Sequence, residues 1–139
     1  MTLHLTDDAA ADALLTDDPF ALLVGMLLDQ QVAMEVAFAG PKKILDRFGT
    51  LEPRAIADAD PEAFLAAFKQ TPAVHRFPGS MAGRVQELAR IIAEEWGGDA
   101  AAIWTSGEPD GPTVLRRLKK LPGFGEQKAR IFLALLGKQ

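Results

Sequence analysis

Apolar residues along this chain recur at the three- and four-residue spacing of helices, and alternation of apolar and polar residues is almost absent. Alanine and leucine dominate these stretches, and β-branched residues rarely cluster. Aspartate precedes proline at Asp18-Pro19 and Asp60-Pro61, which is typical of a helix N-cap and its first helical residue. The pattern predicts an all-α fold, arranged as a multi-helix bundle.

The most apolar segment runs from Phe20 to Phe38, and its large apolar side chains are too many to fit one stripe of a helix. We expect a single long helix here, buried nearly all round. Its polar residues are Asp29, Gln30, Gln31 and Glu35, and buried polar groups need either hydrogen-bond partners or a cleft. Alternatively, these four residues reach the surface at the end of the helix.

Shorter helices are expected on both sides of this segment. Thr6 can cap a helix over residues 7–15, and Gly40-Pro41 is expected to interrupt the long helix. Glycines at Gly49 and Gly97-Gly98 are typical helix ends. The remaining predicted elements are helices over 41–48, from 61 onward and over 80–96, a helical turn over 99–104, a loop over 106–112, and helices over 113–120 and 126–136.

Composition restricts the classes of protein that remain. The 139 residues suit one domain, and 48% hydrophobic with 24% charged residues is typical of an ordinary globular chain. The absence of cysteine excludes disulfides, a cysteine nucleophile and any zinc or iron–sulfur site with cysteine ligands. No apolar run is long enough for a bilayer, and the acid-rich start differs from a signal peptide. We therefore expect a cytoplasmic location.

The charge is divided unevenly along the chain. The net charge is −4, yet residues 111–139 hold seven Lys and Arg and a single acid, Glu126. A local positive cluster on an acidic protein is typical of a site for a polyanion. A solvated basic helix is the other interpretation.

A short connection between the last two predicted helices is the strongest candidate for chemistry. Gly123 and Gly125 permit backbone angles and close approaches that side chains forbid. Their amides precede a helix N-terminus, where free N–H groups and the helix dipole favour an anion such as phosphate. Alternatively, the glycines only allow a sharp bend between two helices.

Basic residues surround this connection and would add counter-charge for a nucleic-acid backbone. Those that flank it directly are Lys119, Lys120 and Lys128, and Arg116, Arg117 and Arg130 lie within two helical turns.

The segment Leu121-Pro122-Gly123-Phe124-Gly125 followed by Glu126-Gln127-Lys128-Ala129 resembles the helix–hairpin–helix of base-excision DNA glycosylases, the superfamily of endonuclease III and the alkylated-base glycosylases. Two other stretches are similar to that superfamily in order and spacing. They are Asp18-Pro19-Phe20 with Leu27-Leu28-Asp29-Gln30-Gln31-Val32, and Ser80-Met81-Ala82-Gly83-Arg84 with Gly97-Gly98-Asp99. The resemblance covers residues 18–137.

The resemblance implies a six-helix bundle that binds double-stranded DNA and holds a damaged nucleotide rotated out of the stack. It implies that Gln31 enters the space near the flipped base. Its remaining implied contacts are backbone amides of Gly123, Gly125, Gln127 and Lys128 on phosphate, and carbonyls of Lys119, Leu121 and Phe124 on K⁺ or Na⁺. When bound to DNA, such a protein would be associated with the nucleoid.

The resemblance also divides the chain. Residues 1–17 would form an N-terminal helix that packs on a C-terminal subdomain outside this chain, and residues 18–139 would form the helix–hairpin–helix domain.

Two departures from the family pattern shape the expected activity. Glycosylases that also cut the backbone resemble each other in a lysine two residues after the second hairpin glycine, where this chain has Gln127, so a Schiff base there is impossible. We interpret the neighbouring Lys128 as a phosphate contact. The family's catalytic aspartate lies about twenty residues beyond the hairpin, and the residues after Gly125 include no aspartate.

We therefore interpret the chain as a piece of a longer monofunctional glycosylase that hydrolyses the bond between a damaged base and its sugar. The 139 residues by themselves are expected to bind DNA without turnover. The alternatives are a natural short form that only binds DNA and an all-α module that binds another protein.

Other candidates are weaker. The pairs Asp7-Asp8, Asp17-Asp18 and Glu94-Glu95 do not face each other on a helix, so we expect caps or solvated faces. His4 and His75 lack ligands at suitable spacing for a metal site, although His75-Arg76 could touch DNA. Trp96 and Trp104 sit at helical apolar positions and are expected in the core.

Overall fold

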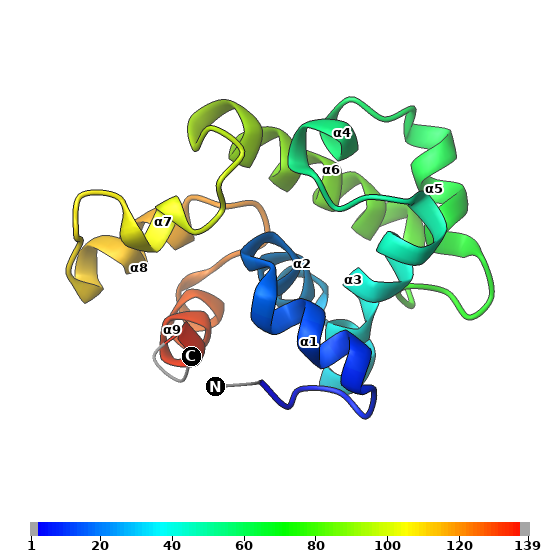
Figure 1. The fold of residues 1–139 in the computed structure, drawn as a ribbon, viewed down its shortest axis with the longest axis horizontal. Coiled ribbons are helices and arrows are strands. Elements are labelled where there is room, and N and C mark those ends of the chain that lie inside the picture. The colour runs from blue at the N-terminus through cyan, green and yellow to red at the C-terminus, as the bar shows by residue number, and fades with distance from the viewer. Residues whose placement is uncertain (1–2, 137–139) are drawn as a thin grey trace.

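The computed structural model describes residues 3–136, which form helices joined by turns and loops (Figure 1). No strand occurs in this part of the chain, so the predicted all-α class is confirmed. The helices are α1 (Ala9–Asp17), α2 (Pro19–Leu28), α3 (Met34–Phe48), α4 (Pro53–Ala57), α5 (Pro61–Lys69), α6 (Pro78–Glu95), α7 (Ala102–Thr105), α8 (Gly111–Lys119) and α9 (Glu126–Leu136).

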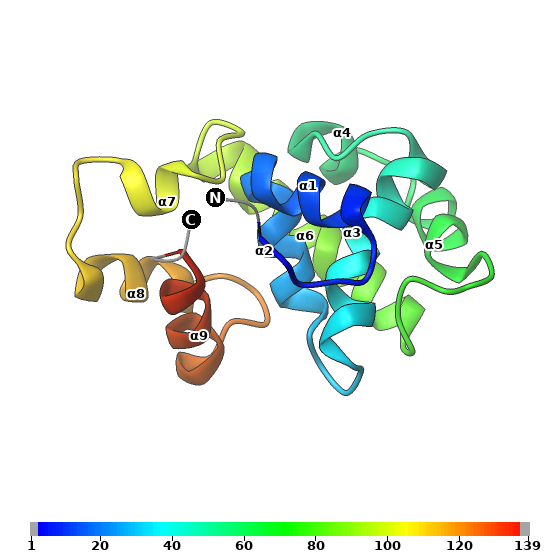
Figure 2. The same ribbon diagram turned by 60° about the horizontal axis from the view of Figure 1, so that its bottom comes forward.

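Helix α2 occupies the centre of the molecule. Figure 2 shows α7, α8 and α9 at one end and α4 and α5 at the other, with α1 and α2 between them. Every residue of α2 from Phe20 to Leu28 is buried, which confirms the expectation of burial on all sides. The helix begins as predicted, because the Asp18 carboxylate accepts hydrogen bonds from the amides of Phe20 (3.0 Å) and Ala21 (3.3 Å).

The prediction of one helix from Phe20 to Phe38 is wrong. The chain leaves α2 after Leu28 and enters α3 at Met34, with Gln31 in the left-handed region at a φ of 59°. We call residues 29–33 the 29–33 turn. Apolar periodicity could not locate this break, because the backbone carbonyls at its start are bonded by side chains that lie far away in the sequence.

The expected break at Gly40-Pro41 is also wrong, since Pro41 lies inside α3. Proline removes one amide donor from a helix and usually bends it, but tertiary packing can hold such a helix together. Both Gly40 and Pro41 are buried, and a Cβ built on Gly40 would lie 2.5 Å from Cδ1 of Leu28. Contact with α2 therefore accompanies the continuation of the helix through the proline.

Several boundaries differ by a few residues from the predicted ones. Helix α1 is capped by Asp8 and not by Thr6, because the Asp8 carboxylate accepts from the amide of Ala10 at 2.9 Å. The Thr6 hydroxyl accepts the Asp8 amide at 3.0 Å in the turn before the helix. Helix α6 begins at Pro78 and α8 at Gly111, each with proline in its first turn. Helix α9 and the ends of helices at Gly49 and Gly97-Gly98 agree with expectation. The short helix α4 was not predicted.

Helix α1 packs on α2 and α3 through Ala11 and Leu15. Whether it also covers a C-terminal subdomain stays a prediction, as does the division at residue 17. The first predicted unit includes residues 1–2 and the second includes residues 137–139, and these five residues lie outside the described part of the chain.

The close approach of α2 and α3 can be tested at Gly25. A Cβ at this position would lie 2.5 Å from Cδ1 of Phe38, whose ring is itself buried and has little room to shift. We expect Gly25→Ala to lower the free energy of unfolding by about 1–3 kcal/mol, as overpacked cores do. Gly83→Ala in α6 is the control, because a Cβ there meets nothing within 4 Å. It should raise stability by about 0.5–1 kcal/mol through helix propensity. Equal urea midpoints for the two variants would contradict this packing.

Candidate nucleic-acid interface

The hairpin between α8 and α9 packs on the core with one side and is open on the other. Leu121 and Phe124 are buried, and the Phe124 ring packs edge-on against Phe132 with centroids 6.0 Å apart. Gly123 has a φ of 79°, and a Cβ there would lie 2.5 Å from Cδ1 of Leu27 in α2. Gly125 differs, because a Cβ there would enter open space. Gly123 therefore serves the fold, whereas Gly125 leaves room for a ligand.

The hairpin contains backbone amides that have no partner among residues 3–136. In residues 3–136 the amides of Gly123 and Gly125 donate no hydrogen bond, and the backbone bonding of α9 starts with Ala129 N–H on the Gly125 carbonyl at 2.9 Å. The amides of the first helical turn before Ala129 have no partner inside the helix. Gly123, Gly125 and Gln127 are exposed. The helix dipole adds positive potential at the same end, so the hairpin has the features of an anion site.

The predicted cations divide into exposed and structural groups. Lys120 is exposed, and its side chain makes no hydrogen bond with the described residues, whereas Lys119 pairs with Glu126 at 3.1 Å. Arg130 pairs with the same carboxylate at 3.3 Å. Hydrogen bonds from Lys119 and Arg130 lower the pKa of Glu126. Surface pairs of this kind contribute little to stability and can exchange for other anions.

Arg117 is part of the fold. Its guanidinium donates to the carbonyls of Ile103 (3.0 Å) and Ser106 (3.1 Å) and lies 5.6 Å from the centroid of the Trp96 ring. Trp96 and Trp104 are half-buried against the core, as predicted, and Trp104 packs on Phe132.

The side chain of Lys128 turns inward to the C-terminal end of α2. Its Nζ donates to the carbonyls of Leu27 at 3.3 Å and Asp29 at 3.2 Å. Those carbonyls have no helical partner, so the ammonium caps α2 across about one hundred residues of sequence. Burial lowers the pKa of Lys128, partly offset by the negative charge of Asp29. The side chain thus has partners within the protein, and the amide of Lys128 remains the candidate phosphate contact.

Three further hydrogen bonds hold the 29–33 turn beside the hairpin. Nη1 of Arg84 donates to Oε1 of Gln30 at 3.1 Å, and Nε2 of Gln30 donates to the Leu27 carbonyl at 3.1 Å. Nε2 of His75 lies 3.0 Å from the Gln30 carbonyl. Gln31 follows in the left-handed conformation with an exposed side chain. Hydrogen bonds thus connect the turn to α6, to α9 and to the segment before α6.

The suggestion that His75 touches DNA is wrong. His75 is 1% exposed, and its Nδ1 accepts the Phe77 amide at 2.9 Å, so Nε2 carries the proton that it shares with the Gln30 carbonyl. Arg76 is exposed and lies 5.5 Å from the centroid of the Phe77 ring. The sequence contained no signal for this buried role, because the partner carbonyl lies 45 residues away.

A cleft of about 550 Å³ joins the hairpin to the 29–33 turn. Four predicted site residues line it, and Arg84 and Asp29 enter it as charged residues that sequence reasoning did not assign to the site. Gln31, Lys119 and Lys120 do not line it: Gln31 follows the lining residue Gln30 on the turn, and the two lysines lie at the end of α8. The cleft is lined by Met26, Asp29, Gln30, Arg84, Gly123, Gly125, Glu126, Gln127, Lys128 and Ile131.

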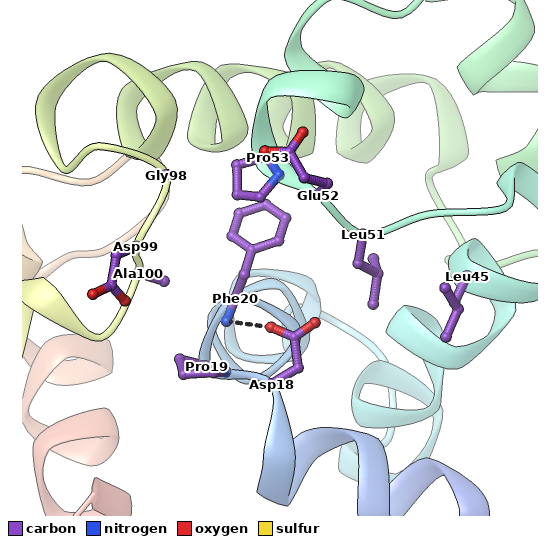
Figure 3. Close-up of a pocket in the computed structure, with 10 residues that line it drawn as sticks. All are labelled: Asp18, Pro19, Phe20, Leu45, Leu51, Glu52, Pro53, Gly98, Asp99 and Ala100. Carbon is purple, nitrogen blue, oxygen red and sulfur yellow. Dashed lines mark hydrogen bonds between the residues drawn. The ribbon is translucent and has the colours of Figure 1, made fainter.

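A separate cavity of about 290 Å³ lies at the opposite, N-terminal end of α2, and its lining includes the carboxylates of Asp18, Glu52 and Asp99, which stand on different sides of it (Figure 3). Each carboxylate already accepts backbone amides, those of Phe20, Ala55 and Ala101 among them. Burial raises the pKa of Asp18 despite these bonds. In residues 3–136 no three acidic or histidine side chains gather closely enough to hold a metal ion. We interpret this cavity as a gap between the capped ends of packed helices, with no role in binding.

Sequence comparison agrees with the fold and the hairpin. Residues 24–133 match the family model described as HhH-GPD superfamily base excision DNA repair protein. This match covers most of the chain, so the chain belongs to that superfamily and the resemblance seen in the sequence is confirmed. A search of curated proteins finds no match. Within the described part of the chain, no helix combines the length and apolar character that crossing a membrane requires.

Removing the Lys128 cap should destabilise the protein. Lys128→Met keeps the apolar stem but leaves the Asp29 carbonyl without a donor and the Leu27 carbonyl with Gln30 alone, so we expect the free energy of unfolding to fall by about 1–2 kcal/mol. Lys120→Met is the matched control and should change stability little, because Lys120 is exposed. Urea titration measures both. Equal loss in the two variants would contradict the capping role.

The burial of His75 predicts a decline of stability in mild acid. Burial lowers the pKa of His75 from 6.5, and the charge of Lys128 acts in the same direction. Well above pH 6.5 the ring is neutral in both the folded and the unfolded chain, so the contribution of His75 to the free energy of unfolding is fully present. Below pH 6.5 the unfolded chain binds a proton that the folded chain resists, and stability is lost. Urea titrations at pH 7.5 and 5.5 should show this loss in the native protein.

The variant His75→Gln should lose part of that pH dependence, whereas the control His4→Gln should keep it, because His4 is exposed. Identical slopes for the two variants would rule out the burial of His75 as the cause.

Proposed function

We propose that this chain binds duplex DNA through its hairpin and belongs to a monofunctional DNA glycosylase, which hydrolyses the bond between a damaged base and its sugar. The described chain supplies the DNA-binding part, and we propose that the 139 residues bind without turnover. The observation that carries this proposal is that the exposed residues Gly123 and Gly125, just before α9, have backbone amides without a partner, in a chain of the base excision repair superfamily.

The proposed contacts of the hairpin are with DNA phosphates. We propose that one DNA phosphate receives the amides of Gly123, Gly125, Gln127 and Lys128, and that Lys119 and Lys120 contact neighbouring phosphates. The open space above Gly125 supports this geometry, because nothing lies within 4 Å of a Cβ placed there. Lys119 would exchange its exposed pair with Glu126 for phosphate.

Gln31 would enter the space near the flipped base. Its exposed side chain stands on a turn that three other elements hold in place, and this support favours a fixed position beside the cleft. A residue that fills the gap left by a rotated nucleotide benefits from such rigidity, because the cost of ordering it is met before DNA binds.

The cation that we propose at the hairpin would be held by backbone carbonyls. The Leu121 carbonyl accepts the Phe124 amide at 3.1 Å and keeps a second lone pair. We propose that it holds K⁺ or Na⁺ together with the carbonyls of Lys119 and Phe124, which would add positive charge at the hairpin.

Backbone contacts make DNA binding sensitive to salt and to the open side of the hairpin. We expect the affinity for an undamaged duplex to fall steeply between about 50 and 200 mM salt. Gly125→Val should weaken binding at least tenfold, because its side chain occupies the phosphate position, while helicity stays unchanged. Ala66→Val, on an exposed position of α5, is the control and should bind normally. Fluorescence anisotropy and circular dichroism measure the two properties.

Failure to bind duplex DNA at low salt would contradict the proposed function and favour a protein-interaction module. Binding that Gly125→Val leaves unchanged would instead place the DNA contact elsewhere on the protein.

The proposal also excludes covalent catalysis by a lysine. Gln127 occupies the position where a Schiff-base lysine would stand, and the amine of Lys128 is bonded to two carbonyls of the α2 end. With DNA that contains an abasic site, borohydride reduction should yield no covalent adduct, as seen on a denaturing gel. An adduct that disappears in Lys128→Met would overturn this assignment.

A further inference from the structure

Gln31 has an unusual backbone conformation that its own contacts do not support. Its φ of 59° lies in the left-handed region, which costs free energy for a residue with a side chain. Neither its backbone nor its exposed side chain makes a hydrogen bond with residues 3–136. Such a conformation persists only where the surrounding structure holds it. Support for Gln31 therefore has to come from the rest of the 29–33 turn.

Gln30, the preceding residue, is bonded at each of its polar groups. Its amide donates to the Leu28 carbonyl at 2.7 Å, and its carbonyl accepts from Nε2 of His75 at 3.0 Å. In the side chain, Oε1 accepts from Arg84 and Nε2 donates to the Leu27 carbonyl, both at 3.1 Å. A guanidinium only donates and a carbonyl only accepts, so the two partners allow one orientation of the Gln30 amide.

Arg84 connects this arrangement to the core. It lies in α6 between the buried residues Ala82 and Val85, so the packing of that helix fixes its backbone. Its side chain is half-buried and lines the cleft beside the hairpin. The one hydrogen bond that its guanidinium makes within residues 3–136 is the bond to Gln30. The position of the Gln30 side chain, and with it the start of the turn, thus depends on Arg84.

We propose that Arg84 is a positioning residue, which acts on DNA binding through Gln30 and Gln31 and not as a phosphate contact. Together with Gln30 it holds Gln31 in the conformation from which the Gln31 side chain enters the gap beside a rotated nucleotide. This inference rests on the proposed function and names the residues on which the role of Gln31 depends. A cation in a DNA-binding cleft usually contacts phosphate, but here the oriented bond to Gln30 favours the positioning role.

The test uses a duplex in which one nucleotide lacks its base. A tetrahydrofuran residue is a stable abasic analogue, and it leaves a gap that Gln31 can fill without the cost of rotating a base out of the stack. We define the gap preference as the affinity for this duplex divided by the affinity for the same duplex with an intact base pair. In fluorescence anisotropy we expect a gap preference of about tenfold for the native chain and of about one for Gln31→Ala.

Three substitutions and one double variant locate the effect. Arg84→Met should lower the gap preference to that of Gln31→Ala, while the affinity for the intact duplex and its salt dependence stay unchanged. The double variant of these two should lose no more than either single one, because residues that act through one another are not additive. Gln30→Met removes the same bond from its other side and should reproduce the loss. Arg84→Lys should keep part of the preference, since an ammonium can still donate to Oε1 of Gln30.

Arg90→Met is the matched control for a general loss of stability. Arg90 also lies in α6 and donates to a backbone carbonyl, that of Ala57 at 2.7 Å, but its other bond is to Glu94 and none is to the turn. This variant should lower the urea midpoint and keep the gap preference. Equal loss of the preference in Arg90→Met and Arg84→Met would mean that weakening of α6, and not the position of Gln30, is the cause.

The outcomes separate this inference from the proposed function. Salt-dependent binding that Gly125→Val weakens, together with a gap preference that survives Arg84→Met, would overturn the inference and leave the proposed function standing. Equal weakening of both duplexes by Arg84→Met with a shallower salt dependence would do the same, because Arg84 would then be a phosphate contact. The inference would also be overturned by a native chain without gap preference or by a further loss in the double variant. Loss of all duplex binding at low salt would overturn both.

Discussion

The C-terminal end of a buried helix needs hydrogen-bond donors, and much of this structure depends on how α2 obtains them. The last carbonyls of a helix have no partner within it, and carbonyls that are partly buried cost free energy unless a donor is found for them. Here Lys128 donates to the carbonyls of Leu27 and Asp29, and His75 bonds that of Gln30. Both donors come from segments more than forty residues away.

This requirement of α2 connects the core to the surface where DNA is proposed to bind. Lys128 stands in the first turn of α9, so the bond that caps α2 also fixes the start of the helix whose amides face the cleft. Gly123 adds a second connection, since its backbone lies against Leu27. The hairpin therefore has its position set by a fully buried helix, and the amides proposed to bind phosphate are held in place before DNA arrives.

The distribution of charge is consistent with the same arrangement. The chain is acidic overall, and most carboxylates described above cap helices or pair with neighbouring cations. Arg117 and Lys128 serve the fold, so the basic segment near the C-terminus contains fewer free cations than its composition indicates. Backbone amides and the dipole of α9 supply the rest of the positive potential at the hairpin. Asp29 lines both the cleft and a neighbouring cavity whose other lining residues are apolar.

The sequence by itself determined the helical class, the starts of α2 and α5, the extent of α9 and the family, because capping, turn chemistry and periodicity act between neighbouring residues. Only the tertiary structure decided the break at the 29–33 turn, the continuation of α3 through Pro41 and the roles of His75, Arg84 and Lys128. Each of these depends on a contact between segments far apart in the chain, such as Lys128 with Leu27 or Gly40 with Leu28. Local patterns carry no record of such contacts, and the free energy of burying polar groups with their partners is set only when the helices pack together.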